Sequence, residues 1–201
     1  MRRPLNLATW VLRIASNAVV LALPGLVLGF TVGVIGAAVG AALGALHAWA
    51  ITSTCCYAVE AKSWLTLLID NTWSAVNSLV GSAFLGYGFM RGNELDQDRC
   101  AGRGSLVMRG EAIRGYATTL GPVEAGTTDD LAAHEAVHVL QARIFGPFFY
   151  PLVGLSYVVC TVLPYWLLYH DHAKWPIRDL RTYFTHGVYP HTWHEEWAYR
   201  V

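Results

Sequence analysis

The stretch LALPGLVLGFTVGVIGAAVGAALGALHAWA, residues 21–50, lies within a longer run, 14–59, that contains no Lys, Arg, Asp or Glu. A helix needs about 20 apolar residues to cross the hydrocarbon core of a membrane. The 46 residues of this run therefore exceed what one crossing requires, and we predict a membrane segment. The run is also longer than the apolar part of a signal peptide, about 7–15 residues, so we interpret it as a permanent anchor.

Glycines recur in this run at every third or fourth residue, at positions 25, 29, 33, 36, 40 and 44. Residues with this spacing share one face of a helix, and small residues on such a face allow a second helix to approach closely. One straight helix over the whole run would measure about 69 Å, more than twice the membrane core of about 30 Å. We therefore favour a helical hairpin within residues 1–60 over one long helix, and we also consider a homo-oligomer through the glycine face.

The composition of the chain agrees with a membrane protein. Of its 201 residues, 54% are hydrophobic and 14% are charged, against about 25% charged in an ordinary soluble domain. The 14 basic and 14 acidic residues give a net charge of zero, so we expect no nucleic-acid partner. The four cysteines match no zinc or disulfide spacing, and we expect them to be reduced.

The basic residues at the N-terminus bear on the topology. Arg2, Arg3 and Arg13 precede the apolar run, and basic residues tend to stay on the cytoplasmic side. A hairpin would then return residues 60–201 to the cytoplasm, whereas a single crossing would place them outside.

Two later segments carry weaker patterns. Residues 64–90 are apolar but are interrupted by Asp70, Asn71 and Asn77, which are costly against lipid, so we predict an interfacial or partly buried helix. The short β-prone runs 105–108 and 116–123 predict a small β-hairpin.

The strongest chemical signal is the sequence HEAVH at residues 134–138, an HExxH motif. On a helix, His134 and His138 project from one face and can bind one Zn2+ ion, while Glu135 can accept a proton from a water molecule on that ion. Gln141 continues the same face one turn further on. The alternative is a pair of surface histidines bonded to neighbouring groups, and we favour the metal site because the motif lies next to a very apolar stretch where polar groups are costly.

Start and stop signals flank this motif. Residues 127–130 (TTDD) supply a helix cap and first-turn acids, and Gly146 and Pro147 end the helix after Phe145. The charge-free run 144–169 that follows contains three prolines, which break a uniform helix. A single crossing there would separate the motif from the residues after 169, so we predict a re-entrant, interfacial or buried segment.

A zinc hydrolase needs a third protein ligand and an open fourth position. The downstream candidates are His170, His172, His186, His191, His194, Glu195 and Glu196. We further consider Tyr189, His191 and His194 as contacts of an oxyanion or a leaving group. The strand at 116–123 is either a plain core strand or an edge that pairs with an extended substrate.

The motifs resemble the gluzincin branch of the HExxH metallopeptidases, in which a Glu on a later helix, often in an ExxA pattern, is the third zinc ligand. Glu195 and Ala198 have this spacing. The CAAX-processing membrane metalloproteases and their bacterial relatives are similar, but they have an Asp after the Ala, where this chain has Tyr199.

The chain also resembles a group of small bacterial HExxH proteins over about residues 116–200. The matching parts are Thr119-Leu120-Gly121, the pattern HExxHxxQ from His134 to Gln141, Gly146-Pro147-Phe148, and Glu195 to Ala198. These resemblances imply a zincin-like core, a zinc ion held by His134, His138 and Glu195, and Glu135 as the catalytic residue, with Gln141, Tyr189, His191, His194 and Glu196 as auxiliary candidates.

We therefore expect a mainly α membrane protein with a small β-hairpin, in which residues 1–60 form the membrane segment and 61–201 a metalloprotease-like domain. The predicted function is hydrolysis of peptide bonds by a membrane-embedded zinc metallopeptidase of a bacterial inner membrane. Its expected partners are the lipid bilayer and a membrane-proximal polypeptide substrate. The alternatives are a non-enzymatic, oligomerising glycine-zipper protein with a structural or vestigial metal site, and a metal hydrolase acting on a lipid or another non-peptide bond.

Overall fold

The computed structural model describes residues 4–58 and 60–201. It is mainly helical, and it divides into two compact units, Met1–Pro147 and Phe148–Val201. Arg2 and Arg3, on which the expected topology partly depends, lie outside the described residues. The expected division of the chain into a membrane segment, residues 1–60, and a metalloprotease-like domain, residues 61–201, stays a prediction.

Three helical stretches are long and apolar enough to cross a membrane, which agrees with membrane association. They are Asn6–Leu28, Phe30–Ser53 and Ala132–Val162.

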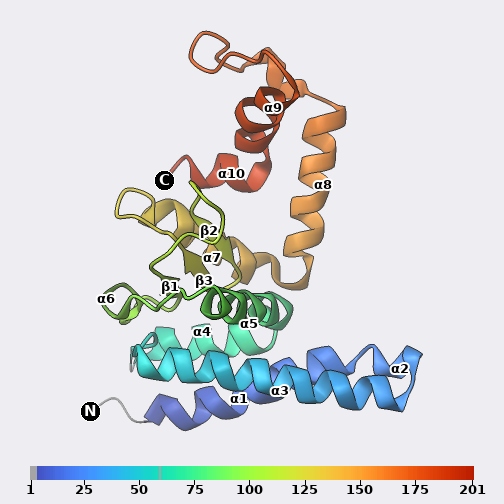
Figure 1. Cartoon of the computed structure of the whole chain (residues 1–201), viewed down its shortest axis with the longest axis vertical. Helices are drawn as coiled ribbons and strands as arrows, with labels where there is room; N and C mark the ends of the chain where they lie inside the picture. Colours follow the sequence, from blue (N-terminus) through green and yellow to red (C-terminus); the bar gives the residue numbers. More distant parts are fainter. Residues whose placement is uncertain (1–3, 59) are drawn as a thin grey trace. The chain divides into compact units, whose positions relative to one another are not determined.

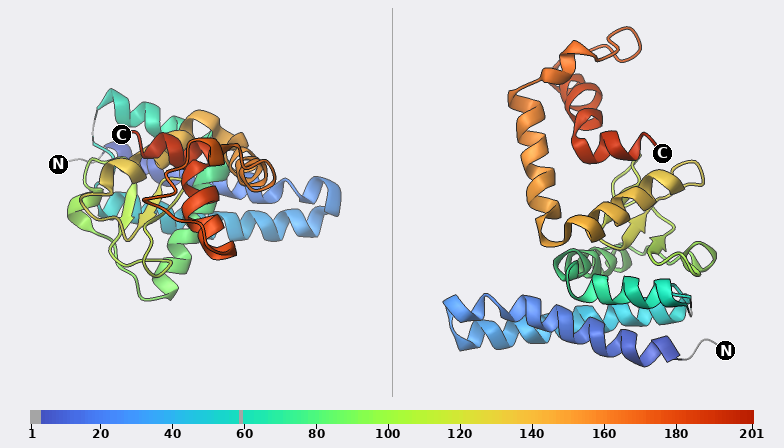
Figure 2. Two further views of the ribbon diagram at one scale, coloured as in Figure 1. Left: turned by 90° about the horizontal axis from the view of Figure 1, so that it is seen from above. Right: turned by 180° about the vertical axis from the view of Figure 1, so that it is seen from behind.

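The first unit begins with two long helices that run side by side, α1 (Pro4–Ala22) and α3 (Phe30–Ser53), as Figures 1 and 2 show. The short helix α2 (Gly25–Leu28) joins them. Gly29 separates α2 from α3 with a φ of 103°, which residues other than glycine rarely adopt. The chain therefore reverses its direction within the apolar run.

The glycine row packs α3 against α1. A Cβ atom placed on Gly36, Gly40 or Gly44 would lie 2.0 to 2.4 Å from a backbone oxygen of α1, so no side chain fits at these positions. The face that we considered for a homo-oligomer is thus covered by the chain's own first helix, and the structure gives that oligomer no support.

Two helices follow where we expected one over residues 64–90. They are α4 (Ala61–Asn71) and α5 (Ala75–Met90). The three polar residues of this region, Asp70, Asn71 and Asn77, are all buried within the protein. Their polar groups bond to other parts of the chain, as when Asn71 donates to the carbonyl oxygen of Leu67 at 2.6 Å. Contact with protein therefore removes the cost that these residues would carry against lipid.

A small mixed sheet lies beside α5 (Figure 1). After the short helix α6 (Gln97–Cys100), the strands are β1 (Leu106–Met108), β2 (Thr118–Leu120) and β3 (Val123–Ala125). The central strand β3 pairs in parallel with β1 and antiparallel with β2.

The expected hairpin of 105–108 with 116–123 is therefore wrong. The hairpin is instead formed by β2 and β3, because the chain turns between them at Gly121, whose φ is 56°. A Cβ atom on Gly121 would lie 2.1 Å from the carbonyl oxygen of Asn77, so the turn also requires glycine for its close contact with α5. The first run joins the sheet on the other side of β3.

Helix α7 (Ala132–Phe145) carries the HExxH motif and ends where we expected, at Gly146 with a φ of 53°. The expected cap from residues 127–130 is not formed, because Leu131 occupies the cap position and no side chain bonds there. The side chain of Thr127 instead contacts the Glu124 carboxylate at 3.3 Å.

The second unit is helical throughout its regular structure. Its elements are α8 (Phe149–Val162), the 3-10 turn η2 (Tyr165–Leu168), α9 (Leu180–Thr182), the π-helical turn η3 (Tyr183–Val188), η4 (Tyr189–His191) and α10 (Trp193–Ala198). Cys160, Trp166 and Val188 form its buried core.

The charge-free run 144–169 is not one uniform helix, as its prolines predict. The 3-10 turn η1 (Gly146–Phe148) separates α7 from α8, and α8 ends before Pro164. Helix α8 has 14 residues, which is about 21 Å and shorter than the membrane core of about 30 Å. The re-entrant or interfacial placement of this segment stays a prediction.

Candidate metal centre

The imidazole rings of His134 and His138 face each other on α7. Their Nε2 atoms are 3.1 Å apart and the rings are nearly perpendicular, at 80°. Two nitrogen ligands at about 2.0–2.1 Å from a tetrahedral zinc ion would be about 3.3 Å apart. The two histidines therefore have the spacing that one shared metal ion requires.

Both histidines and the glutamate between them are held in the first unit. His138 is buried, and its Nδ1 atom lies 3.0 Å from Oε1 of the fully buried Gln141. Glu135 is 4% exposed, and its Oε2 accepts a hydrogen bond from the Thr119 hydroxyl at 2.5 Å. The sequence predicts a strand at Thr119, but no pattern in it indicates the contact with Glu135.

Thr119 belongs to β2, which forms one edge of the sheet. Its Cα partner across the ladder is Glu124 of β3. The sheet therefore places an edge strand directly beside the carboxylate of the HExxH motif.

A buried ion pair supports the N-terminal end of α7. Arg103 contacts both carboxylate oxygens of the fully buried Glu124, at 3.1 and 2.9 Å, and donates to the carbonyl oxygen of Ala132 at 2.9 Å. Ser105 also donates to this carboxylate, at 2.7 Å. The first turn of α7 is thus fixed to the sheet.

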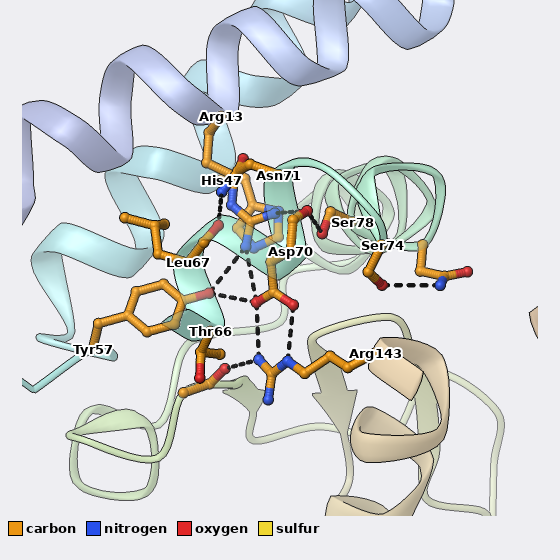
Figure 3. A network of polar contacts seen from close by, with 12 residues as sticks. Arg13, His47, Tyr57, Thr66, Leu67, Asp70, Asn71, Ser74, Ser78 and Arg143 are labelled. Carbon is orange, nitrogen blue, oxygen red and sulfur yellow. Dashed lines mark hydrogen bonds and ion pairs between the residues drawn. The ribbon is translucent and has the colours of Figure 1, made fainter. Parts of the chain in front are cut away.

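A second buried network supports the C-terminal end of α7, as Figure 3 shows. Asp70 of α4 binds Arg143 of α7, and it also accepts hydrogen bonds from Tyr57 at 2.6 Å and from Arg13 of α1 at 3.4 Å. Burial alone would raise the pKa of Asp70, but the two guanidinium groups and the Tyr57 hydroxyl hold that pKa below its ordinary value.

Side chains from α5 and the preceding turn bond to carbonyl groups at the C-terminal end of α7. Ser74 donates to the oxygen of Ala142 at 3.0 Å, and Asn77 donates to the oxygens of Ala142 and Gly146 at 2.8 Å. A helix leaves its last carbonyl groups without partners inside the helix. The oxygen of Ala142 also accepts the backbone N–H of Gly146, so the side-chain bonds add to the helix's own bond and fix the end of α7 within the first unit.

Glu195 lies in the second unit, on α10. Its side chain is 5% exposed, and its Oε1 atom lies 3.7 Å from Nε2 of His194. Burial raises the pKa of Tyr189, and the negative charge of Glu195 raises it further. The buried carboxylate therefore lies close to His194 and Tyr189 in the second unit.

The remaining downstream candidates have structural partners in the second unit. Glu196 forms a 2.5 Å ion pair with Arg200 at the surface. The other contacts join ring nitrogens to backbone oxygens: His170 to Trp175 at 2.7 Å, His186 to Pro176 at 3.1 Å and His191 to Gly187 at 2.6 Å. The ring of His172 contacts that of His170, with centroids 4.8 Å apart.

His134 and His138 belong to the first unit and Glu195 to the second, and each carries a side chain of a type that can bind a metal ion. The four cysteines are free thiols, as the sequence had indicated.

Comparison with protein-family models found no match to this chain, and neither did comparison with curated proteins or with solved structures.

Proposed function

We propose that this chain is a membrane-embedded zinc metallopeptidase that hydrolyses peptide bonds. The observation that carries the proposal is the arrangement on α7, where two imidazole Nε2 atoms lie 3.1 Å apart and a buried carboxylate occupies the same turn. A helix that serves only for packing gains nothing from these polar groups, because burying them is costly.

His134 and His138 would hold the ion, and we propose Glu195 as the third protein ligand. Glu195 supports this role by its burial within the second unit and by its ExxA spacing to Ala198. Glu196 is a weaker candidate because it is engaged with Arg200. Three protein ligands leave the fourth position of a tetrahedral site for water or substrate.

A zinc ion bound there would act as a Lewis acid and would lower the pKa of a coordinated water molecule. Glu135 would accept the proton of the attacking water and pass it to the leaving amine. The Thr119 hydroxyl, which donates to Glu135 at 2.5 Å, would hold the carboxylate in one orientation. The edge strand β2 could pair with an extended peptide and bring the scissile bond beside Glu135.

The apolar helices point to the class of substrate. Three stretches are long and apolar enough to cross a membrane, so an active site on the same chain would act at or near a bilayer. We propose a membrane-proximal polypeptide as the substrate and a bacterial inner membrane as the location. The alternative of an oligomerising glycine-zipper protein gains no support, since the glycine row packs against α1.

Glu135→Gln tests the proposal, because the amide keeps the shape of the side chain and cannot act as a base. The protein would be purified in detergent, loaded with zinc and incubated with a fluorescence-quenched casein and with a membrane-anchored reporter polypeptide. We expect cleavage by the wild type and no cleavage by Glu135→Gln, with zinc retained in both.

Glu196→Gln is the matched control and should cleave at the wild-type rate. Full activity of the Glu135→Gln protein would exclude the mechanism proposed here. A wild type that retains zinc and cleaves neither substrate would favour a structural metal site.

A further inference from the structure

Gln141 is a buried amide that no other part of the proposed mechanism uses. It lies on α7 one turn after His138 and has no exposed surface. Residues three apart on a helix are neighbours on its surface. Burying an amide costs free energy unless its polar atoms are bonded, so the contacts of Gln141 indicate why it is there.

The contact with His138 has a defined direction. The carbonyl oxygen Oε1 of Gln141 lies 3.0 Å from Nδ1 of His138. A carbonyl oxygen only accepts hydrogen bonds, so Nδ1 must carry the proton. In a neutral imidazole the other nitrogen, Nε2, then carries the lone pair.

The position of that lone pair fits the metal centre. Nε2 of His138 is the atom that lies 3.1 Å from Nε2 of His134. A proton on this nitrogen would prevent it from binding a metal ion, whereas a lone pair allows it. The hydrogen bond at Nδ1 thus selects the tautomer that the metal centre requires.

We propose that Gln141 is a positioning residue, whose carbonyl oxygen holds His138 as the Nδ1–H tautomer and orients its Nε2 atom for zinc. The inference rests on the proposed function, because it concerns the same metal centre. Metal-binding histidines generally donate their second nitrogen to such a partner, and removal of the partner weakens metal binding about 10- to 100-fold.

Three variants of the full chain, purified in detergent, separate this role from a packing role. Gln141→Leu keeps approximately the side-chain volume and removes the acceptor. Gln141→Glu supplies an acceptor that cannot donate when ionised. Gln97→Leu is the matched control, because Gln97 is exposed on α6.

The first measurement is zinc affinity, by competition with a chromogenic chelator. We expect Gln141→Leu to raise the dissociation constant about 10- to 100-fold, and we expect Gln141→Glu and Gln97→Leu to stay close to the wild type. Thermal unfolding of the metal-free proteins is measured in parallel. The loss of zinc affinity should be larger than a smaller folded fraction could explain. Equal affinities of the wild type and Gln141→Leu would overturn the inference, as would a Gln141→Glu protein as weak as Gln141→Leu.

The second measurement reads the tautomer directly and needs neither metal nor substrate. Nitrogen NMR of histidine-labelled, metal-free protein at a pH of about 8.5, well above the ordinary histidine pKa of about 6.5, distinguishes a protonated Nδ1 from a protonated Nε2. His138 should carry its proton on Nδ1 in the wild type and should show the Nε2–H form in Gln141→Leu.

The two measurements also separate this inference from the proposed function. A wild type that retains no zinc would contradict the proposed function, and the spectra would then decide the inference alone. A change of the His138 tautomer in Gln141→Leu would support it, and identical spectra would overturn it.

Discussion

The guanidinium group of Arg143 and the carboxylate of Asp70 form a bidentate pair, with Nε to Oδ1 and Nη2 to Oδ2 distances of 2.8 and 2.9 Å. Asp70 is 1% exposed, and it also binds Arg13 on α1 (Figure 3). One buried carboxylate therefore connects the helix of the HExxH motif to the apolar hairpin.

Asp70→Asn should strongly destabilise the protein, because it removes the negative charge that two buried guanidinium groups share. Removing one partner of a buried ion pair costs about 3–5 kcal/mol. Unfolding by denaturant in detergent measures the loss.

Asp129→Asn is the control for this prediction. Asp129 pairs with Arg99, but its side chain is 96% exposed, so its loss should cost less than about 1 kcal/mol. Equal losses of unfolding free energy in the two variants would show that the buried Asp70 ion pair stabilises the protein no more than an exposed ion pair does.

The same pair predicts how stability depends on pH. The guanidinium groups lower the pKa of folded Asp70 below its unfolded value, which is about 3.9. Their contribution is therefore complete above a pH of about 4 and is lost as the pH falls through the lower, folded pKa.

Unfolding free energies of wild type and Asp70→Asn, measured at a series of pH values from neutral to acidic, test this dependence. The difference between the two proteins should be constant near neutral pH and should shrink in acid. A difference that grew in acid would have the wrong sign for the mechanism.

The sequence predicted that Asp70, Asn71 and Asn77 avoid lipid, and the structure shows each of them buried within the protein. Their partners were not predictable. Arg143 is 73 residues from Asp70, and nothing in the local pattern indicates which distant residue a buried carboxylate binds. Burial cost constrains the environment of a residue, but tertiary folding determines its partner.

Gly40→Ala should destabilise the hairpin. The added Cβ atom would lie 2.2 Å from the carbonyl oxygen of Asn17, so α1 and α3 would have to separate, at a cost of about 1–3 kcal/mol. Thermal unfolding in detergent measures the effect.

Gly154→Ala is the control, because the new Cβ in α8 would meet nothing within 4 Å apart from its chain neighbours and the backbone of its own helix. It should leave stability unchanged or raise it, since alanine favours a helix over glycine by about 1 kcal/mol. A harmless Gly40→Ala would mean that the two helices are not in close contact.

Thr119→Val should reduce cleavage without releasing metal. The valine keeps the shape of the side chain but cannot donate to Glu135, and a hydrogen bond to a charged group contributes about 1.5–3 kcal/mol. We expect kcat to fall about tenfold or more, with zinc content unchanged and with activity restored in Thr119→Ser. Loss of zinc from Thr119→Val would instead assign Thr119 to the structure of the metal centre.

The site was predictable from the sequence to different degrees. The spacing of His134 and His138 sufficed to place both imidazoles on one face of α7, because helix geometry is local. The contact of Thr119 with Glu135 depends on the packing of β2 against α7, and the parallel pairing of β1 with β3 depends on the whole sheet. Strands of three residues are too short to show an alternating pattern, so their pairing could not be read from the sequence.

The most direct test of the central claim is zinc content per chain in detergent-purified protein. The wild type would be measured beside His134→Ala, Glu195→Ala and Glu196→Ala. The account predicts one zinc per chain in the wild type and in Glu196→Ala, and loss of zinc from the other two variants. A wild type that binds no zinc when it is supplied, or a Glu195→Ala protein that binds it as tightly as the wild type, would contradict the three-ligand centre.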